Sequence, residues 1–124
     1  MKVLIVDDSA IVRERLKAML SEIMELRDIS QAKDSLEGIS CFQKLHPGVI
    51  ILDIRMPGGS GIDVLQKIKK SAQPPLVIVL TNYPYPQYRS KCMDAGADFF
   101  FDKSTEFDKV IEVLKQLNQN QSRQ

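Results

Sequence analysis

Three short apolar runs constrain the fold of this chain more than any other feature. They cover residues 3–6, 49–52 and 76–80, and they contain only valine, isoleucine and leucine. Runs of this length without a polar position are typical of strands that are covered on both faces, as in a parallel sheet. Two weaker runs, residues 26–32 and 99–101, complete a set of five expected strands.

Helical patterns separate these runs. Apolar side chains recur every three or four residues in four segments, which predicts four amphipathic helices. The four stripes are Val12, Leu16, Met19, Leu20 and Ile23; Leu36, Ile39, Phe42 and Leu45; Ile62, Leu65 and Ile68; and Phe107, Val110, Ile111, Leu114 and Leu117. A further helix between residues 80 and 99 is expected from Pro86, which suits a first helical position, and Gly96, which suits a C-terminal cap.

Several signals predict where these helices begin and end. Ser9 is placed to cap the first helix, and Thr105 and Asp108 form a capping-box pattern before the last one. Residues from Asn118 onward are polar and are expected to fray. Residues 58–61 read Gly-Gly-Ser-Gly and lack the lysine of a phosphate-binding loop, so we expect a flexible loop entering the third helix.

The order is strand then helix, five times. This alternation predicts an α/β fold with a five-stranded parallel, doubly wound sheet and right-handed crossovers. A chain of 124 residues buries about two-thirds of its surface on folding, which is enough for one core. No linker divides the chain, so we expect one domain over residues 1–120 and a polar tail over 121–124 that could begin a linker.

The composition argues against several classes of function. The formal net charge is +1, so this chain alone has no overall field for nucleic acid or an anionic membrane. Cys41 and Cys92 lie far apart, which favours two reduced thiols over a disulfide or a zinc site. No secretion signal and no apolar run of roughly 20 residues is visible, so a cytoplasmic protein without a membrane span is expected.

Polar side chains follow four of the expected strands. Asp7 and Asp8 follow the first, Asp53 the third, Thr81 the fourth and Lys103 the fifth. Ligands of open α/β sheets bind beyond the carboxyl ends of the strands, where these residues converge. Three crowded carboxylates repel one another, so an unpaired cluster would either raise at least one pKa or recruit a cation. Their hard oxygens suit Mg²⁺. With an ammonium and a hydroxyl nearby, the cluster suits a phosphoryl group, which one carboxylate could accept as a nucleophile.

These residues belong to motifs that resemble the receiver domain of two-component response regulators, the family that includes the single-domain chemotaxis regulator. The resemblance covers residues 2–117. It is carried by Val3-Leu4-Ile5-Val6-Asp7-Asp8-Ser9, Ile51-Leu52-Asp53-Ile54-Arg55-Met56-Pro57 with Gly61, Leu80-Thr81, Ala95-Gly96-Ala97-Asp98 and Lys103. It implies the five-stranded flavodoxin-like fold and a phosphorylation-controlled switch, not an enzyme acting on a separate substrate.

The resemblance also implies a role for each matching residue. Asp53 would accept phosphate from a sensor histidine kinase or a phosphotransfer protein. Lys103 and Thr81 would contact the phosphoryl oxygens. Phe100 would be the aromatic switch residue, whose ring turns inward and reshapes the face of the fourth helix, fifth strand and fifth helix toward an output partner or a second copy. Mg²⁺ would be held by four groups: Asp7, Asp8 as the more direct ligand, Asp53 and the backbone carbonyl of Arg55.

Three departures from the family pattern leave these groups intact. Ser104 replaces the proline that usually follows the lysine, so we expect a trans peptide bond there. Asn82 stands where the family has a small residue, and Gly48 where it has an acidic one. All three tyrosines, Tyr83, Tyr85 and Tyr88, follow Thr81 closely and could either pack a loop or anchor an interface.

Three other functions compete with a stand-alone switch. The chain could be the receiver portion of a DNA-binding transcriptional regulator, since the Phe-Asp-Lys-Ser run resembles receivers attached to such domains. A phosphohydrolase with an aspartate nucleophile would need a second aspartate at position 55, which is Arg55. A flavodoxin-like electron carrier would need a hydroxyl- and glycine-rich loop where Asp7 and Asp8 stand.

Overall fold

The apolar runs form the centre of a five-stranded parallel sheet with the strand order β2-β1-β3-β6-β7. A computed structural model of the chain describes residues 1–56 and 59–122. The strands are β1 (Val3–Val6), β2 (Ile29–Ala32), β3 (Val49–Leu52), β6 (Leu76–Thr81) and β7 (Phe99–Asp102). β1 and β3 pair without offset, Val6 opposite Leu52, so Asp7 and Asp53 leave the sheet at the same level.

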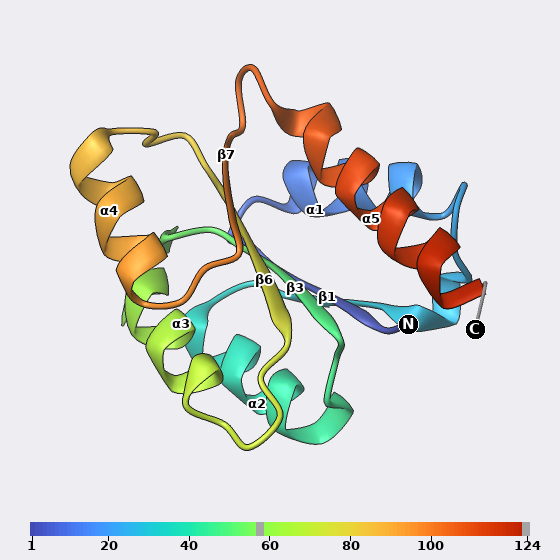
Figure 1. The fold of residues 1–124 in the computed structure, drawn as a ribbon, viewed down its shortest axis with the longest axis horizontal. Coiled ribbons are helices and arrows are strands. Elements are labelled where there is room, and N and C mark those ends of the chain that lie inside the picture. The colour runs from blue at the N-terminus through green and yellow to red at the C-terminus, as the bar shows by residue number, and fades with distance from the viewer. Residues whose placement is uncertain (57–58, 123–124) are drawn as a thin grey trace.

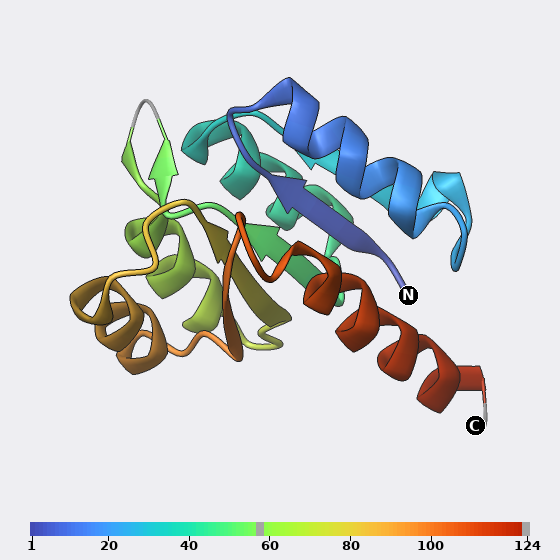
Figure 2. The same ribbon diagram turned by 90° about the horizontal axis from the view of Figure 1, so that it is seen from above.

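Helices cover both faces of the sheet (Figures 1 and 2). One face carries α1 (Ala10–Leu20) and α5 (Phe107–Ser122). The other carries α2 (Ser35–Leu45), α3 (Gly61–Lys69) and α4 (Pro86–Asp94). The predicted doubly wound α/β fold is therefore confirmed.

Alternate residues of each central strand enter two separate cores. Leu4 and Val6 of β1 pack on the side of α2, α3 and α4, whereas Val3 and Ile5 pack on the side of α1 and α5. A strand buried on both faces has no position for a polar side chain, which explains the uninterrupted apolar runs.

The helix boundaries agree with most of the predicted signals. The hydroxyl of Ser9 accepts a hydrogen bond from the amide of Val12 at the start of α1. Pro86 occupies the first turn of α4, and Gly96 follows that helix with a φ of 105°. No peptide bond among the described residues is cis, so the bond before Ser104 is trans as predicted.

The second strand is shorter than predicted. Only Ile29–Ala32 pairs with β1, and Leu26–Asp28 form a short 3₁₀ helix, η1. Leu26 is 58% exposed. The expectation of a strand from residue 26 was wrong because β2 lies at the edge of the sheet, where pairing on one side sets its length.

The predicted apolar stripe of α2 is wrong at its first position. Leu36 is 84% exposed, whereas Ser35 and Gly38 face the sheet. A Cβ atom at Gly38 would lie only 3.0 Å from Cγ1 of Val6, so α2 packs closely on β1 through its small residues. That close approach turns Leu36 outward.

The loop before α3 contains a short strand pair that the sequence did not predict. Arg55–Met56 (β4) pair antiparallel with Gly59–Ser60 (β5), so part of the segment expected to be a flexible loop is paired as a strand. Pro57 and Gly58 of the predicted motifs lie outside the described residues. A Cβ atom at Gly61 would collide with the backbone carbonyl oxygen of Asp53, which is a physical reason for glycine at that position.

The last helix differs from its prediction at both ends. It begins at Phe107, one residue later than the capping-box pattern from Thr105 indicates, and Glu106 instead accepts a hydrogen bond from the amide of Asp102. α5 continues to Ser122, so the predicted fraying from Asn118 is wrong. The Asn118 side-chain amide donates to the carbonyl of Ile23 at 2.8 Å, which fixes α5 to the segment after α1. Residues 123–124 of the predicted tail lie outside the described residues.

None of the helices in the described part of the chain is long and apolar enough to cross a membrane.

Candidate functional site

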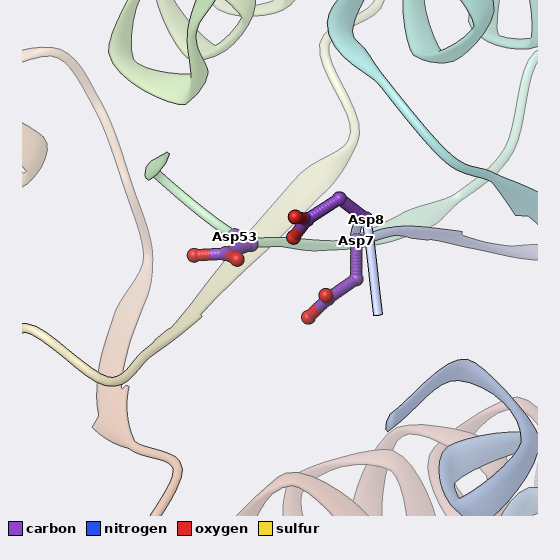
Figure 3. Close-up of side chains that lie close together, drawn as sticks. All are labelled: Asp7, Asp8 and Asp53. Atoms are coloured by element: carbon purple, nitrogen blue, oxygen red, sulfur yellow. The ribbon is translucent and has the colours of Figure 1, made fainter. Parts of the chain in front are cut away.

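Three aspartates meet at the carboxyl edge of the sheet (Figure 3). Asp7 and Asp8 leave the end of β1, and Asp53 leaves the end of the neighbouring strand β3. One carboxylate oxygen from each of the three lies within 4.8 Å of the others. Figure 3 shows the Asp8 carboxylate directed toward Asp53. The structure therefore confirms the predicted convergence of these three side chains.

Lys103 forms ion pairs with two of the three carboxylates. It follows β7, and its Nζ lies 2.7 Å from Oδ2 of Asp7 and 3.2 Å from Oδ2 of Asp53. All three side chains are almost completely buried. A buried carboxylate pair without a cation would be strongly destabilising, so this shared ammonium holds the site together.

The side chain of Asp7 is fixed at both oxygens. While Oδ2 faces Lys103, Oδ1 accepts a hydrogen bond from the amide of Ser9 at 2.9 Å. The backbone amide of Asp7 donates to the carbonyl of Ala32 on the edge strand. The backbone carbonyl of Asp7 accepts from Nη1 of Arg13 at 2.6 Å. Asp7 is therefore held rigidly at the end of β1.

Neighbouring groups and burial shift the pKa of Asp53 in opposite directions. Burial raises the pKa of its carboxyl group, and the nearby charge of Asp7 raises it further. The ammonium of Lys103 and a hydrogen bond donated by the amide of Arg55 at 3.3 Å lower it, and the net direction is upward. For Lys103, burial alone would lower the pKa, but the carboxylates of Asp7 and Asp53 outweigh it and raise the value.

Thr81 lies at the end of β6 and has no exposed surface. Its hydroxyl oxygen accepts a hydrogen bond from the amide of Tyr83 at 3.0 Å, and its carbonyl accepts from the amide of Lys103 at 2.9 Å. The fold therefore ties the hydroxyl-bearing strand end directly to the residue that carries the ammonium. Thr81, Lys103 and the aspartates line one edge, as the sequence predicted.

The Asp8 carboxylate differs from its neighbours. It is exposed, and no hydrogen bond or ion pair to it is found among the described residues. Together the three aspartates offer hard, anionic oxygen ligands, the donor set that Mg²⁺ prefers. The residues present thus fit the metal that the sequence predicted, with Asp8 as the carboxylate most free to bind it.

Phe100 is buried on the far side of β7 from α5. It is 4% exposed and packs in the core beneath α4, so its ring already lies inward in this structure. The guanidinium carbon of Arg89, on α4, lies 5.6 Å from the centre of the Phe100 ring, and its Nη1 lies 3.4 Å from the Phe100 carbonyl oxygen. On the other side of the strand, the rings of Phe99 and Phe101 stack with centroids 5.7 Å apart.

Two features of the site were not predicted from the sequence. One is the hydrogen bond from Arg13 to Asp7, and the other is the position of the Arg55 guanidinium over the Tyr83 ring, at 4.4 Å. A basic residue near the start of the helix that follows the acidic pair was a signal for the first. The second joins two loops through their side chains, which no periodicity or spacing reveals.

Comparison with known proteins gives a consistent result. Residues 3–115 match the family described as the response regulator receiver domain. Among curated proteins, the chain is 30% identical over 123 residues to the transcriptional regulatory protein BtsR of Escherichia coli, covering 99% of this chain and 50% of that protein. It is 28% identical over 116 residues to the response regulator GacA of Pseudomonas aeruginosa, covering 94% and 54%. The chain thus spans about half the length of these curated relatives.

Solved structures share both fold and extent with this chain. The N-terminal domain of an uncharacterized protein from Wolinella succinogenes has a TM-score of 0.87 and 32% identity, with 99% of this chain and 98% of that chain covered. The chemotaxis protein CheY4 of Vibrio cholerae has a TM-score of 0.82 and 25% identity, with 93% and 96% covered. The response regulator domain of Thermotoga maritima CheB has a TM-score of 0.78 and 32% identity, with 97% and 94% covered.

Proposed function

This chain belongs to the response regulator receiver domain family of two-component systems, and from that premise we propose that Asp53 is its phosphoacceptor. The phosphoryl donor is a phosphohistidine on a sensor kinase or phosphotransfer protein. The domain acts on its own side chain and not on a separate substrate, so it is a switch and not an enzyme in the usual sense. Since the kinase draws its phosphate from ATP, the cytoplasm is the proposed location.

The transfer step follows from the position of Asp53. A carboxylate oxygen of Asp53 attacks phosphorus, forming a phosphorus–oxygen bond while the phosphorus–nitrogen bond of the donor breaks. The released imidazole nitrogen keeps the bonding electron pair and takes a proton from solvent. Lys103, now 3.2 Å from Oδ2 of Asp53, is within reach of the oxygens that the phosphoryl group would bring. Thr81 offers a hydroxyl from the neighbouring strand end.

A divalent cation fits the same site. Asp7, Asp8, Asp53 and the backbone carbonyl of Arg55 are the groups we propose to hold Mg²⁺. When bound, Mg²⁺ supplies positive charge for the phosphoryl oxygens. Asp7 holds the ammonium of Lys103 in place, so this positive charge is positioned before the transfer begins.

The observation that carries this proposal is the shared ammonium of Lys103. It lies within 3.2 Å of both Asp7 and Asp53, which come from two different strands, and it is itself almost fully buried. A structural ion pair needs one carboxylate, whereas this arrangement places a second carboxylate and the exposed Asp8 beside it. The excess negative charge is the feature that a divalent cation explains, and the cation in turn would compensate the charge of a phosphoryl group.

Phosphorylation of Asp53 would be transmitted through Thr81 and Phe100. The amide of Tyr83 donates to the Thr81 hydroxyl oxygen, so a movement of Thr81 toward phosphate changes the loop that leads to α4. Phe100 packs beneath α4 and is already inward, so the change is a shift of α4 relative to this ring and not entry of an exposed ring. The face formed by α4, β7 and α5 is the proposed contact surface for an output partner or a second phosphorylated copy.

Labelling with acetyl phosphate tests the proposal. The wild-type chain, incubated with acetyl phosphate and Mg²⁺, should gain the mass of one phosphoryl group in an intact mass spectrum. Asp53→Asn is the matched control, since it keeps the size of the side chain and removes the nucleophilic carboxylate. Equal labelling of both proteins, or no labelling of the wild type, would overturn the assignment.

A second candidate is the receiver portion of a longer transcriptional regulator. Two of the matched curated relatives are about twice as long as the matched region, and one is named as a transcriptional regulatory protein. The chain alone, with a net charge of +1, is not expected to bind DNA. The full reading frame around this sequence decides between the two: a DNA-binding domain after residue 124 favours the regulator.

A further inference from the structure

The guanidinium of Arg13 binds the backbone next to the three aspartates. Arg13, half-buried in the first turns of α1, donates from Nη1 to the backbone carbonyl of Asp7 at 2.6 Å. Its Nε donates to Oε1 of Gln31, on β2, at 3.0 Å. The Gln31 amide in turn lies 3.4 Å from Oε1 of Glu14. Arg13 thus ties the end of β1 to the neighbouring strand through two hydrogen bonds in different directions.

The hydrogen bond from Arg13 is made to the peptide unit that precedes Asp8. The carbonyl of Asp7 and the amide of Asp8 share a planar peptide unit, so fixing that carbonyl fixes the direction in which Asp8 leaves the chain. On the far side of Asp8, the amide of Ser9 is fixed by Oδ1 of Asp7 at 2.9 Å. Both backbone neighbours of Asp8 are therefore restrained.

The Asp8 side chain has no such restraint of its own. It is exposed, and among the described residues its carboxylate makes no hydrogen bond or ion pair. Its carboxylate nevertheless lies within 4.8 Å of those of Asp7 and Asp53. The direction in which the Asp8 side chain leaves the backbone is therefore restrained by its two neighbouring peptide units, one of which is held by Arg13.

We propose that Arg13 is a positioning residue for the divalent-cation site, acting on Asp8 through the Asp7 carbonyl; this inference rests on the proposed function. Groups that hold metal ligands in place typically change metal affinity by about 10- to 100-fold when removed. The two bonds of Arg13 need a planar guanidinium with diverging donors, which a lysine ammonium does not provide.

Simple electrostatics predicts the opposite effect. A positive charge beside a cation site repels the cation, so removing Arg13 should strengthen metal binding if its charge were all that mattered. The sign of the change in affinity therefore separates positioning from charge. Arg15 provides the matched control, since it is on the same helix but its guanidinium carbon lies 4.0 Å from the centre of the Phe107 ring.

The test is a titration of the metal-free chain with Mn²⁺. Binding is measured as the loss of the electron paramagnetic resonance signal of free Mn²⁺. Four variants are compared with wild type: Arg13→Lys, Arg13→Met, Gln31→Met and Arg15→Met. Thermal unfolding without metal is measured for each. We expect Arg13→Met to bind Mn²⁺ about 10-fold more weakly, Arg13→Lys nearly as weakly, and Gln31→Met with a smaller loss. Arg15→Met should bind like wild type or slightly more tightly.

Each remaining outcome counts against a specific statement. Unchanged or tighter Mn²⁺ binding by Arg13→Met, with a lower unfolding temperature, would show that Arg13 only stabilises the fold and would overturn the inference. Wild-type affinity in Arg13→Lys would show that the two diverging donors of the guanidinium are not needed, and it would overturn the inference as well. If wild type itself fails to bind Mn²⁺, the proposed function falls, and the inference falls with it.

Discussion

The guanidinium carbon of Arg55 lies 4.4 Å from the centre of the Tyr83 ring. Arg55 follows β3 and donates its amide hydrogen to Oδ1 of Asp53, and Tyr83 follows β6 and donates to the hydroxyl oxygen of Thr81. The two side chains therefore form a bridge between the loops that hold the proposed phosphoacceptor and the proposed phosphate-binding hydroxyl. Neither side chain has a carboxylate or amide that could orient a water molecule for attack.

This bridge predicts a long-lived phosphorylated form. Tyr83→Glu removes the ring that covers the Arg55 guanidinium and adds a carboxylate that can orient water, so water should reach the phosphoryl group more easily. A cation–π contact at a partly exposed site is worth about 0.5–1 kcal/mol, which predicts loss of phosphate at least about 2- to 5-fold faster. Decay of the phosphoryl mass after donor removal measures this. Tyr85→Glu is the control, because Tyr85 pairs with Tyr88 and not with Arg55; equal rates in both variants would contradict the bridge.

Asp8→Ala should lose most metal binding and keep its stability. The side chain is exposed and lies near two other carboxylates, so its removal relieves repulsion in the metal-free protein. Asp7→Ala provides the contrast: it removes the acceptor for Lys103 and Ser9, and we expect it to lose about 1–3 kcal/mol of stability. Mg²⁺ affinity of the wild type should weaken as pH falls, since carboxylates must be ionised to bind. Calorimetric titration and thermal melts measure both quantities, and a clear drop in the metal-free melting temperature of Asp8→Ala would refute the argument.

Lys103→Met should be less stable than the wild type, because Asp7 and Asp53 would then lie close together without a cation. Asp7 and Asp53 are 3% and 6% exposed, and removing their shared ammonium leaves buried charge unpaired, which costs about 3–5 kcal/mol. The pKa of Asp53, already raised by burial, should rise further, so the folded variant should bind protons more readily than the unfolded chain. Its stability should therefore fall as pH rises from acid to neutral, and Mg²⁺ should stabilise it more than wild type. Urea unfolding at several pH values tests this; a variant as stable as wild type at neutral pH would contradict it.

Cys92 should make the fold sensitive to alkaline pH. Burial raises the pKa of its thiol from 9.0 to about 11. Below pH 9 both folded and unfolded chains keep the thiol protonated; between about pH 9 and 11 only the unfolded chain ionises, so folding loses roughly 2 to 3 kcal/mol as pH rises. Cys92→Ala should be less stable at neutral pH but should lack this part of the pH dependence. The difference in unfolding free energy between wild type and variant, measured from pH 8 to 11, should shrink as pH rises, and a constant difference would contradict the assignment.

The sequence predicted the fold and the position of the site because both depend on strand ends. A run such as 49–52, apolar at every position, is compatible with a strand covered on both faces, and its last residue marks the edge where Asp53 emerges. In a parallel sheet all carboxyl ends lie at the same edge, so Asp7, Asp53 and Lys103 emerge on one edge of the molecule.

The parts that the sequence did not predict depend on contacts between side chains or on edges with little burial. β2 lies at the sheet edge, so its length does not follow from apolar residues alone. Leu36 is exposed because Gly38 lets α2 approach Val6, which periodicity cannot reveal. The pairing of Arg55 with Tyr83 depends on the courses of two loops that are distant in sequence. The roles assigned to Asp53, Thr81, Lys103 and the metal ligands remain predictions.

The most direct test of the central claim is to locate the phosphoryl group chemically. Borohydride reduces an aspartyl phosphate to an alcohol and releases phosphate, which leaves a stable mark on the residue that carried it. After labelling with acetyl phosphate and Mg²⁺, reduction and peptide mapping should find the mark on Asp53 alone, because Asp53 is the carboxylate beside both Lys103 and the strand end that carries Thr81. A mark on Asp7 or Asp8, or no mark on a chain that has gained phosphoryl mass, would contradict the account.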